Sequence, residues 1–91
     1  MNWFVYIIEC SDGALYTGVS TDVARRFRQH AETKQGARFF RGRIPLKVVY
    51  VESGHSRSSA CKREAAIKRG SRDSKLHLIA EANAAAVSAA P

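Results

Sequence analysis

The first twenty residues constrain the fold more than any other part of the chain, because they have the pattern of two strands joined by a tight turn. Residues 3–10 are rich in aromatic and β-branched side chains, which favour strands, and residues 14–19 have a similar character. Asp12 and Gly13 between them are typical turn residues. Both faces of the first strand are apolar, so we expect a central strand that is covered on both sides.

The register of this hairpin decides which side chains share a face. If the turn is centred on residues 11–13, Ile8 lies opposite Tyr16 and Tyr6 lies opposite Gly18. Strand side chains alternate between faces, so these four residues share one face and the two tyrosines become diagonal neighbours. The missing side chain of Gly18 then predicts open space over the sheet, where the backbone of a ligand can approach. A register shifted by one residue would instead separate the tyrosines.

Two amphipathic helices are expected, over residues 21–33 and residues 56–69. In the first helix Arg26 lies one turn before His30, at the edge of the apolar face. In the second helix Glu64 falls on or beside the apolar stripe, at the spacing of Ala60 and Ile67. A carboxylate in that position is costly unless it is paired or holds a cation. A salt bridge to a neighbouring Lys or Arg is the simpler of those two explanations.

A third strand is expected over residues 47–52, and we place it beside the hairpin. The predicted fold class is therefore α+β, with a three-stranded antiparallel sheet flanked by helices. Gly70 should end the second helix, and a shorter helix should follow it through Ile79. We assign residues 1–79 to one domain and residues 80–91 to an alanine-rich C-terminal tail, which we expect to fray.

The balance of charge points to a polyanionic partner. Fifteen Lys and Arg against eight Asp and Glu give a net charge of +7, which favours nucleic acid, although a soluble domain with a basic surface has the same balance. Arg38, Arg41 and Arg43 lie in a glycine-punctuated loop that suits phosphate contacts. No segment resembles a signal peptide or a membrane span, so we expect a cytoplasmic protein with free thiols and no membrane partner.

Taken together, these residues resemble the GIY-YIG nuclease family, and most closely its small standalone members with a URI-type endonuclease domain. The segments that carry the resemblance are Phe4-Val5-Tyr6, Tyr16-Thr17-Gly18, residues 22–26 with His30, and Lys62-Arg63-Glu64. Their order and spacing match over nearly the whole chain up to about Ile79. Phe4 stands where the family motif has glycine. Asn83 is the candidate for an asparagine that many members carry, but it lies outside a convincing match and we do not assign it.

The resemblance implies a DNA endonuclease that hydrolyses phosphodiester bonds with a single divalent cation, Mg²⁺ or Mn²⁺. It implies catalytic roles for Tyr6, Tyr16, Arg26, His30 and Glu64. Tyr6 is the expected general base, although it needs a nearby cation because a free tyrosine has a pKa of about 10. Direct attack by a tyrosine oxygen is the less favoured route. For His30, proton transfer and phosphate contact both remain open.

The other expected roles concern metal and substrate binding. Glu64 is the expected metal ligand, and Arg26 is suited to gripping phosphate oxygens. We expect the substrate to contact Thr17, Gly18 and the basic loop that carries Arg38, Arg41 and Arg43.

The chemistry leaves alternatives open. A nucleic-acid-binding module with weak or no catalysis would explain the basic loop, but it has no need of Glu64. An adaptor that binds an acidic protein is a third possibility, and no motif supports it. We expect low sequence specificity for DNA, with RNA not excluded and a protein partner able to supply specificity. DNA repair is an expectation at the level of the family only.

Overall fold

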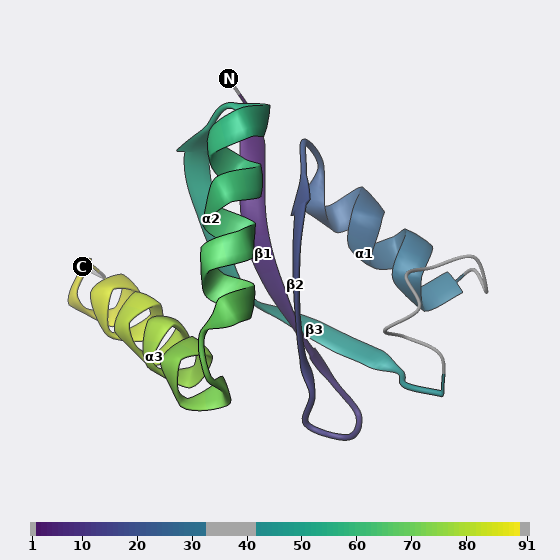
Figure 1. Cartoon of the computed structure of the whole chain (residues 1–91). Helices are drawn as coiled ribbons and strands as arrows, with labels where there is room; N and C mark the ends of the chain where they lie inside the picture. The colour runs from purple at the N-terminus through teal and green to yellow at the C-terminus, as the bar shows by residue number, and fades with distance from the viewer. Residues whose placement is uncertain (1, 33–41, 90–91) are drawn as a thin grey trace.

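The computed structural model describes residues 2–32 and 42–89. Strands β1 (Trp3–Cys10) and β2 (Leu15–Ser20) form the predicted hairpin, and α1 (Val23–Glu32) follows it. Strand β3 (Pro45–His55) leads into α2 (Arg57–Arg69) and α3 (Arg72–Ala89). The sheet is antiparallel with the order β2-β1-β3, and helix α1 lies on one face while α2 and α3 lie on the other (Figure 1). This arrangement confirms the predicted α+β class.

The hairpin has the predicted register. Tyr6 pairs with Gly18 and Ile8 pairs with Tyr16, so these four residues share the face that α1 covers. The turn closes with a hydrogen bond from the Cys10 backbone N–H to the Ala14 carbonyl oxygen. The alternation of strand side chains therefore places both tyrosines on one side of the sheet.

The central strand β1 divides the hydrophobic core into two layers. On the α2 side, Val5 and Ile7 pack with Ala60 and Ile67. On the α1 side, Tyr6 and Ile8 belong to a second cluster that includes Phe27. Because β1 is covered on both faces, its side chains from Trp3 to Ile8 are apolar or aromatic on both, as the sequence predicted.

The third helix is longer than predicted. We expected a short helix that ends near Ile79, but α3 continues to Ala89. Leu78 and Ile79 pack against the core, and the alanines after them have the highest helix propensity, so the chain extends the same helix. Within residues 2–32 and 42–89, no helix is long and apolar enough to cross a membrane.

Candidate active site

Three predicted site residues meet on the α1 side of the hairpin. The hydroxyl oxygen of Tyr6 lies 3.4 Å from Nε2 of His30. The ring centroids of Tyr6 and Tyr16 are 6.3 Å apart, and those of Tyr16 and His30 are 5.3 Å apart. Tyr6 and His30 are buried, whereas Tyr16 is partly exposed. We call Tyr6, Tyr16 and His30 the tyrosine–histidine cluster.

Helix α1 holds His30 over the sheet. The helix begins after Asp22, whose carboxylate accepts a hydrogen bond from the Arg25 backbone N–H at 3.0 Å and so caps the first turn. Val23 and Phe27 pack on the sheet, and His30 follows one turn later on the same face. The amphipathic spacing predicted from the sequence therefore directs the imidazole toward the tyrosines.

Gly18 does not leave open space over the sheet, and this corrects our prediction. A Cβ at this position would lie 2.6 Å from the hydroxyl oxygen of Tyr6 and 2.7 Å from Cζ of the same ring. The space above the glycine is therefore filled by the Tyr6 ring. Gly18 allows that ring to lie directly over β2, and it offers no approach for a ligand backbone.

Arg26 lies at the exposed edge of the tyrosine–histidine cluster. Its Nη1 donates a hydrogen bond to Oε1 of Gln29 at 3.3 Å on the exposed side of α1. Its positive charge and hydrogen bonding also act on the Tyr6 hydroxyl. An exposed guanidinium in this position can reach both a buried phenol and a phosphate that approaches from solvent.

The pKa values of the cluster do not suit Tyr6 acting as a general base by itself. Burial and the neighbouring Tyr16 raise the pKa of Tyr6 to about 12, and Arg26 offsets only part of that shift. Burial also lowers the pKa of His30, and the charge of Arg26 adds to the effect. Near neutral pH the cluster therefore holds a protonated phenol beside a neutral imidazole, in which one nitrogen can accept a proton.

Helix α2 brings Glu64 to the same region past the free edge of β2. The Glu64 side chain is 23% exposed, and Lys68 Nζ lies 3.4 Å from its Oε2 atom. Lys68 Nζ also lies 5.9 Å from the centroid of the Tyr16 ring. The charge of Glu64 contributes to the raised pKa of Tyr6. The structure thus places all five predicted catalytic residues around one site.

Lys68 itself was not predicted as a site residue. The sequence shows it as one of four basic residues close to Glu64, and spacing alone does not single it out. The available signal is its position one turn after Glu64, where the two side chains can meet. Its contact with Tyr16 depends on how α2 lies against β2, which no local pattern contains.

The donor set of the site fits a single hydrated cation. Within the described segments, no group of three or more His, Cys, Asp or Glu side chains could hold a metal ion. The carboxylate of Glu64 is partly exposed, so water can reach it. Mg²⁺ binds to one or two carboxylates and keeps several waters, so a lone accessible glutamate suits it.

Within the described part of the chain, the structure does not bring the predicted substrate-binding residues together at this site. The Thr17 side chain is 2% exposed and lies on the opposite face of the hairpin from Tyr16, so the prediction that it contacts substrate is wrong. Its hydroxyl has no hydrogen-bond partner among the residues that the structure describes. Arg43 forms an ion pair with Asp12 at the hairpin turn, with Nε 2.7 Å from Oδ2. Arg38 and Arg41 lie outside the described residues.

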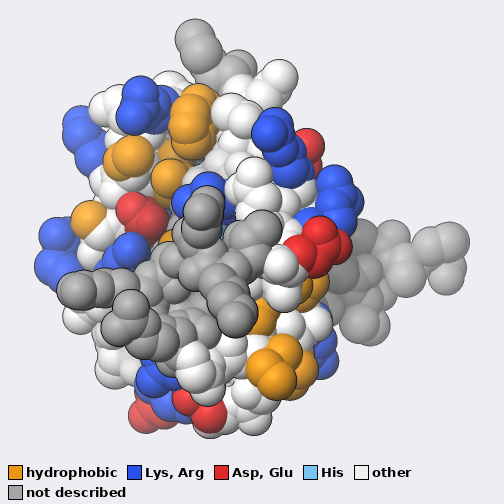
Figure 2. All heavy atoms as spheres, turned by 90° about the vertical axis from the view of Figure 1, so that its right-hand side faces the viewer, with side chains coloured by type: hydrophobic (Ala, Val, Ile, Leu, Met, Phe, Trp, Pro, Cys, Tyr) orange, Lys and Arg blue, Asp and Glu red, His pale blue; other side chains and the backbone are white. Residues whose placement is uncertain are grey.

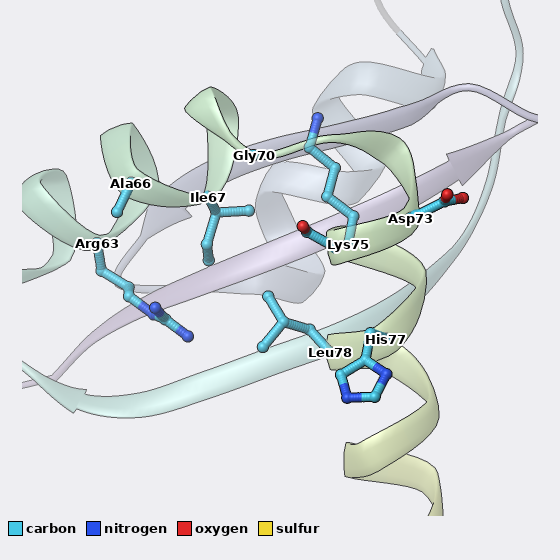
Figure 3. A pocket seen from close by; sticks show the side chains of 9 residues that line it. Arg63, Ala66, Ile67, Gly70, Asp73, Lys75, His77 and Leu78 are labelled. Carbon is cyan, nitrogen blue, oxygen red and sulfur yellow. The ribbon is translucent and has the colours of Figure 1, made fainter.

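A pocket of about 570 Å³ lies between α2 and α3, on the other face of the sheet (Figure 3). Ile67 and Leu78 point toward each other across it, and Arg63 borders it beneath α2. Because Ile67 and Leu78 belong to the core layer on the α2 side, the pocket is separated from the tyrosine–histidine cluster by the sheet. The tyrosine–histidine cluster therefore lies on the side of the sheet that α1 covers, away from this pocket. Figure 2 shows Lys and Arg side chains spread over that side of the molecule.

The fold and the site define the class of the protein. The chain matches the GIY-YIG catalytic domain family over residues 2–77, and it belongs to that family. Its relatives include UPF0213 proteins. One from Desulfotalea psychrophila is 49% identical over 77 residues, which cover 85% of this chain and 70% of the relative. Another from Streptococcus agalactiae is 45% identical over 76 residues, which cover 84% and 85% of the two chains.

A solved structure supports the same assignment. The solution NMR structure of a UPF0213 protein from Bacillus halodurans matches with a TM-score of 0.56 and 42% sequence identity, and the match covers 88% of this chain and 84% of that one. The resemblance read from the sequence is therefore confirmed. Membership of the GIY-YIG family indicates a nuclease-type function and implies a nucleic acid substrate.

Proposed function

We propose that this protein is a divalent-metal-dependent endonuclease that hydrolyses phosphodiester bonds of DNA with low sequence specificity. The observation that carries the proposal is the convergence of five chemically suited side chains. Tyr6, Tyr16 and His30 are in contact, and the charges of Arg26 and Glu64 both act on the Tyr6 hydroxyl. A domain that only bound nucleic acid would not require a carboxylate beside these groups.

The substrate approaches the cluster from the exposed side of α1, where Arg26 lies. A duplex is too large for an enclosed cavity, and the exposed edge of α1 gives its backbone access to the cluster. Arg26 grips the non-bridging oxygens of the phosphate, because a guanidinium matches their geometry and stays charged at every relevant pH. Tyr16, partly exposed beside Tyr6, orients the water or the phosphate.

Glu64 would hold the metal ion, with water completing its coordination shell. When bound, the ion supplies charge stabilisation to the phosphoryl group and to the departing oxygen. The chain itself must then receive the proton of the attacking water. With a pKa of about 12, Tyr6 alone is a poor acceptor in the metal-free protein.

The Tyr6–His30 pair provides that acceptor. The attacking water gives its proton to the Tyr6 oxygen while the phenolic proton moves to Nε2 of His30, so Tyr6 ends neutral and His30 becomes charged. This relay requires the His30 tautomer that is protonated on Nδ1. The lowered pKa of His30 keeps the imidazole neutral near neutral pH, so Nε2 can accept the proton from Tyr6. Of the two roles considered for His30, we therefore propose proton transfer and not phosphate contact.

A cleavage assay tests the proposal. Supercoiled plasmid, single-stranded DNA, branched DNA and RNA are incubated with Mg²⁺ or Mn²⁺ and with EDTA controls. We expect metal-dependent cleavage of DNA that falls roughly 10²–10³-fold or more in Glu64→Gln and in Arg26→Ala, because each removes charge stabilisation at the phosphate. Glu81→Gln and Arg28→Ala are matched controls, since both change exposed charges elsewhere on the helices.

Two results would contradict the proposal. Full cleavage by Glu64→Gln would remove the metal role from this residue. Salt-sensitive DNA binding without turnover in either metal would favour the alternative, a nucleic-acid-binding module. Circular dichroism of each variant shows whether a loss of cleavage reflects a loss of fold.

A further inference from the structure

Lys68 occupies a position that the proposed catalytic roles do not explain. Its Nζ lies 3.4 Å from Oε2 of Glu64 and 5.9 Å from the centroid of the Tyr16 ring. The ammonium group therefore lies close to both the Glu64 carboxylate and the Tyr16 ring. The Lys68 side chain is 51% exposed, so it is free to leave this position for solvent.

The position of Lys68 contributes little to the stability of the fold. An ion pair between residues four apart on an exposed helix surface contributes little to folding, because water screens the charges and two long side chains must be ordered. The contact with the face of Tyr16 adds a weak attraction of its own. Together they hold a positive charge at the carboxylate that is suited to bind a cation.

A divalent ion and this ammonium group compete for the same carboxylate. A Mg²⁺ ion binds a carboxylate oxygen at roughly 2.1 Å, so it would lie within a few ångströms of the present position of Lys68 Nζ. At such separations the two positive charges repel. Binding of the metal to Oε2 therefore requires Lys68 to move away from Glu64.

We propose that Lys68 is the resident cation of the site, which holds Glu64 in the metal-free protein and is displaced when the metal binds. This rests on the proposed function, in which Glu64 is the metal ligand. The displaced ammonium group, still tethered to α2 beside Tyr16, then contacts the phosphate backbone of the substrate. Lys68 thus competes with the metal for Glu64 in the free protein and contacts phosphate in the loaded site.

The exchange couples metal binding to DNA binding. Without DNA, the released Lys68 has lost its partner, so the metal binds weakly. With DNA, a phosphate replaces Glu64 as the partner of Lys68, so the metal binds more tightly. Because coupling between two ligands is reciprocal, the metal must strengthen DNA binding by the same factor. The site is therefore loaded cooperatively by metal and substrate.

The first experiment measures Mn²⁺ affinity of the DNA-free protein by calorimetry or by electron paramagnetic resonance. We expect Lys68→Met to bind Mn²⁺ roughly tenfold more tightly than the wild type, because a competing charge is removed close to the ion. Lys62→Met is the matched control, since Lys62 is an exposed lysine on the same helix and its loss changes the net charge equally. Lys68→Arg keeps the charge and should keep the weak wild-type affinity.

The second experiment measures DNA affinity by fluorescence anisotropy with a labelled duplex, with Ca²⁺ or with EDTA. We expect the metal to strengthen DNA binding by the wild type severalfold, and this gain to disappear in Lys68→Met and in Glu64→Gln. A gain of equal size in Lys68→Met and in the wild type would overturn the coupling. The same Lys62→Met variant controls for general weakening of DNA binding by a lost charge.

The outcomes separate this proposal from the proposed function. If Mn²⁺ binding is abolished by Glu64→Gln but Lys68→Met binds no more tightly than Lys62→Met, the metal role of Glu64 stands and the role of Lys68 is overturned. Weaker Mn²⁺ binding in Lys68→Met would likewise overturn it, because Lys68 would then orient Glu64 instead of competing for it. If Glu64→Gln leaves Mn²⁺ binding unchanged, the proposed function fails at its metal ligand.

Discussion

Gly18 and Tyr6 show how one backbone position governs the geometry of the site. The Tyr6 ring is buried and lies against the Cα of Gly18, where any Cβ would come within 2.6 Å of its hydroxyl oxygen. A Cβ atom does not approach another heavy atom this closely without a bond, so a side chain at position 18 must displace the ring. The displacement would separate Tyr6 from His30, whose contact at 3.4 Å supports the proposed proton relay.

We therefore expect Gly18→Ala to lower both stability and cleavage. Overpacking of this kind costs about 1–3 kcal/mol, which urea unfolding can measure. In a Tyr6→Ala background the same Gly18→Ala change should cost little, because the ring that it strikes is absent. Additive effects of the two substitutions would show that the glycine serves another purpose.

At the scale of elements, the position of α2 is set by a network around Glu52 of β3. The Glu52 carboxylate accepts a hydrogen bond from the Tyr50 hydroxyl at 2.6 Å, and His55 Nε2 lies 2.6 Å from its other oxygen. Arg63 Nε of α2 donates to both oxygens, at 3.1 and 3.2 Å. Arg63 of α2 is thereby held against β3. Glu64 is the next residue on the helix and points in a different direction, toward the edge of β2.

We expect Glu52→Gln to destabilise the protein near neutral pH by about 1–3 kcal/mol, the cost of weakening bonds between a carboxylate and charged partners. Burial alone would raise the pKa of Glu52, but hydrogen bonds from Tyr50 and His55 and the pairing with Arg63 lower it overall. A lowered pKa contributes stability that is present above the unfolded-state value of about 4.5 and is lost as the pH falls through the folded-state pKa.

Urea unfolding at neutral pH and at pH 3 checks this prediction. The stability difference between the wild type and Glu52→Gln should shrink at pH 3, because this pH lies below the unfolded-state pKa of the Glu52 carboxyl group and the unfolded wild type takes up a proton there. Glu81→Gln changes an exposed carboxylate on α3 and should leave the acid dependence unaltered. A difference that is equally large at both pH values would contradict the role of the Glu52 charge.

At the scale of the whole molecule, the two faces of the sheet carry different groups of side chains. The side that α1 covers carries the tyrosine–histidine cluster, whereas the side that α2 and α3 cover carries the larger aliphatic core. Each face also carries a tyrosine that is at least partly buried. Burial raises the pKa of Tyr6 to about 12 on the first face, and on the second face burial together with Glu52 raises the pKa of Tyr50.

We expect the whole fold to lose stability as the pH rises above about 10. A tyrosine whose folded-state pKa exceeds its unfolded-state value of about 10 stabilises the protein below pH 10, and this contribution is lost as the pH rises through the folded-state pKa. For Tyr6 the slope is about 1.4 kcal/mol per pH unit between pH 10 and 12. Unfolding at several alkaline pH values should show a shallower decline for Tyr6→Phe than for the wild type, and Tyr50→Phe separates the share of the second tyrosine.

Several features of this protein were determined by local sequence. A period of two along residues 3–10 and a short turn set the register that places Tyr6 and Tyr16 on one face. A helical period set the inward position of His30, and the order of the motifs along the chain indicated the family. Such patterns can be read from the sequence because each involves residues within a few positions of one another, or strands joined by one turn.

Other features were decided only by the tertiary structure. The filling of the space above Gly18 by Tyr6, the contact of Lys68 with Tyr16, and the clamp of Arg63 on Glu52 join side chains whose meeting depends on how elements pack. The raised pKa of Tyr6 belongs to the same group, since it follows from burial between a sheet and a helix. The local periodicity of the sequence predicts which face of its own helix or strand a residue occupies. Which side chains that face contacts depends on packing, because the path of α2 across the sheet is set by contacts distributed over the whole chain.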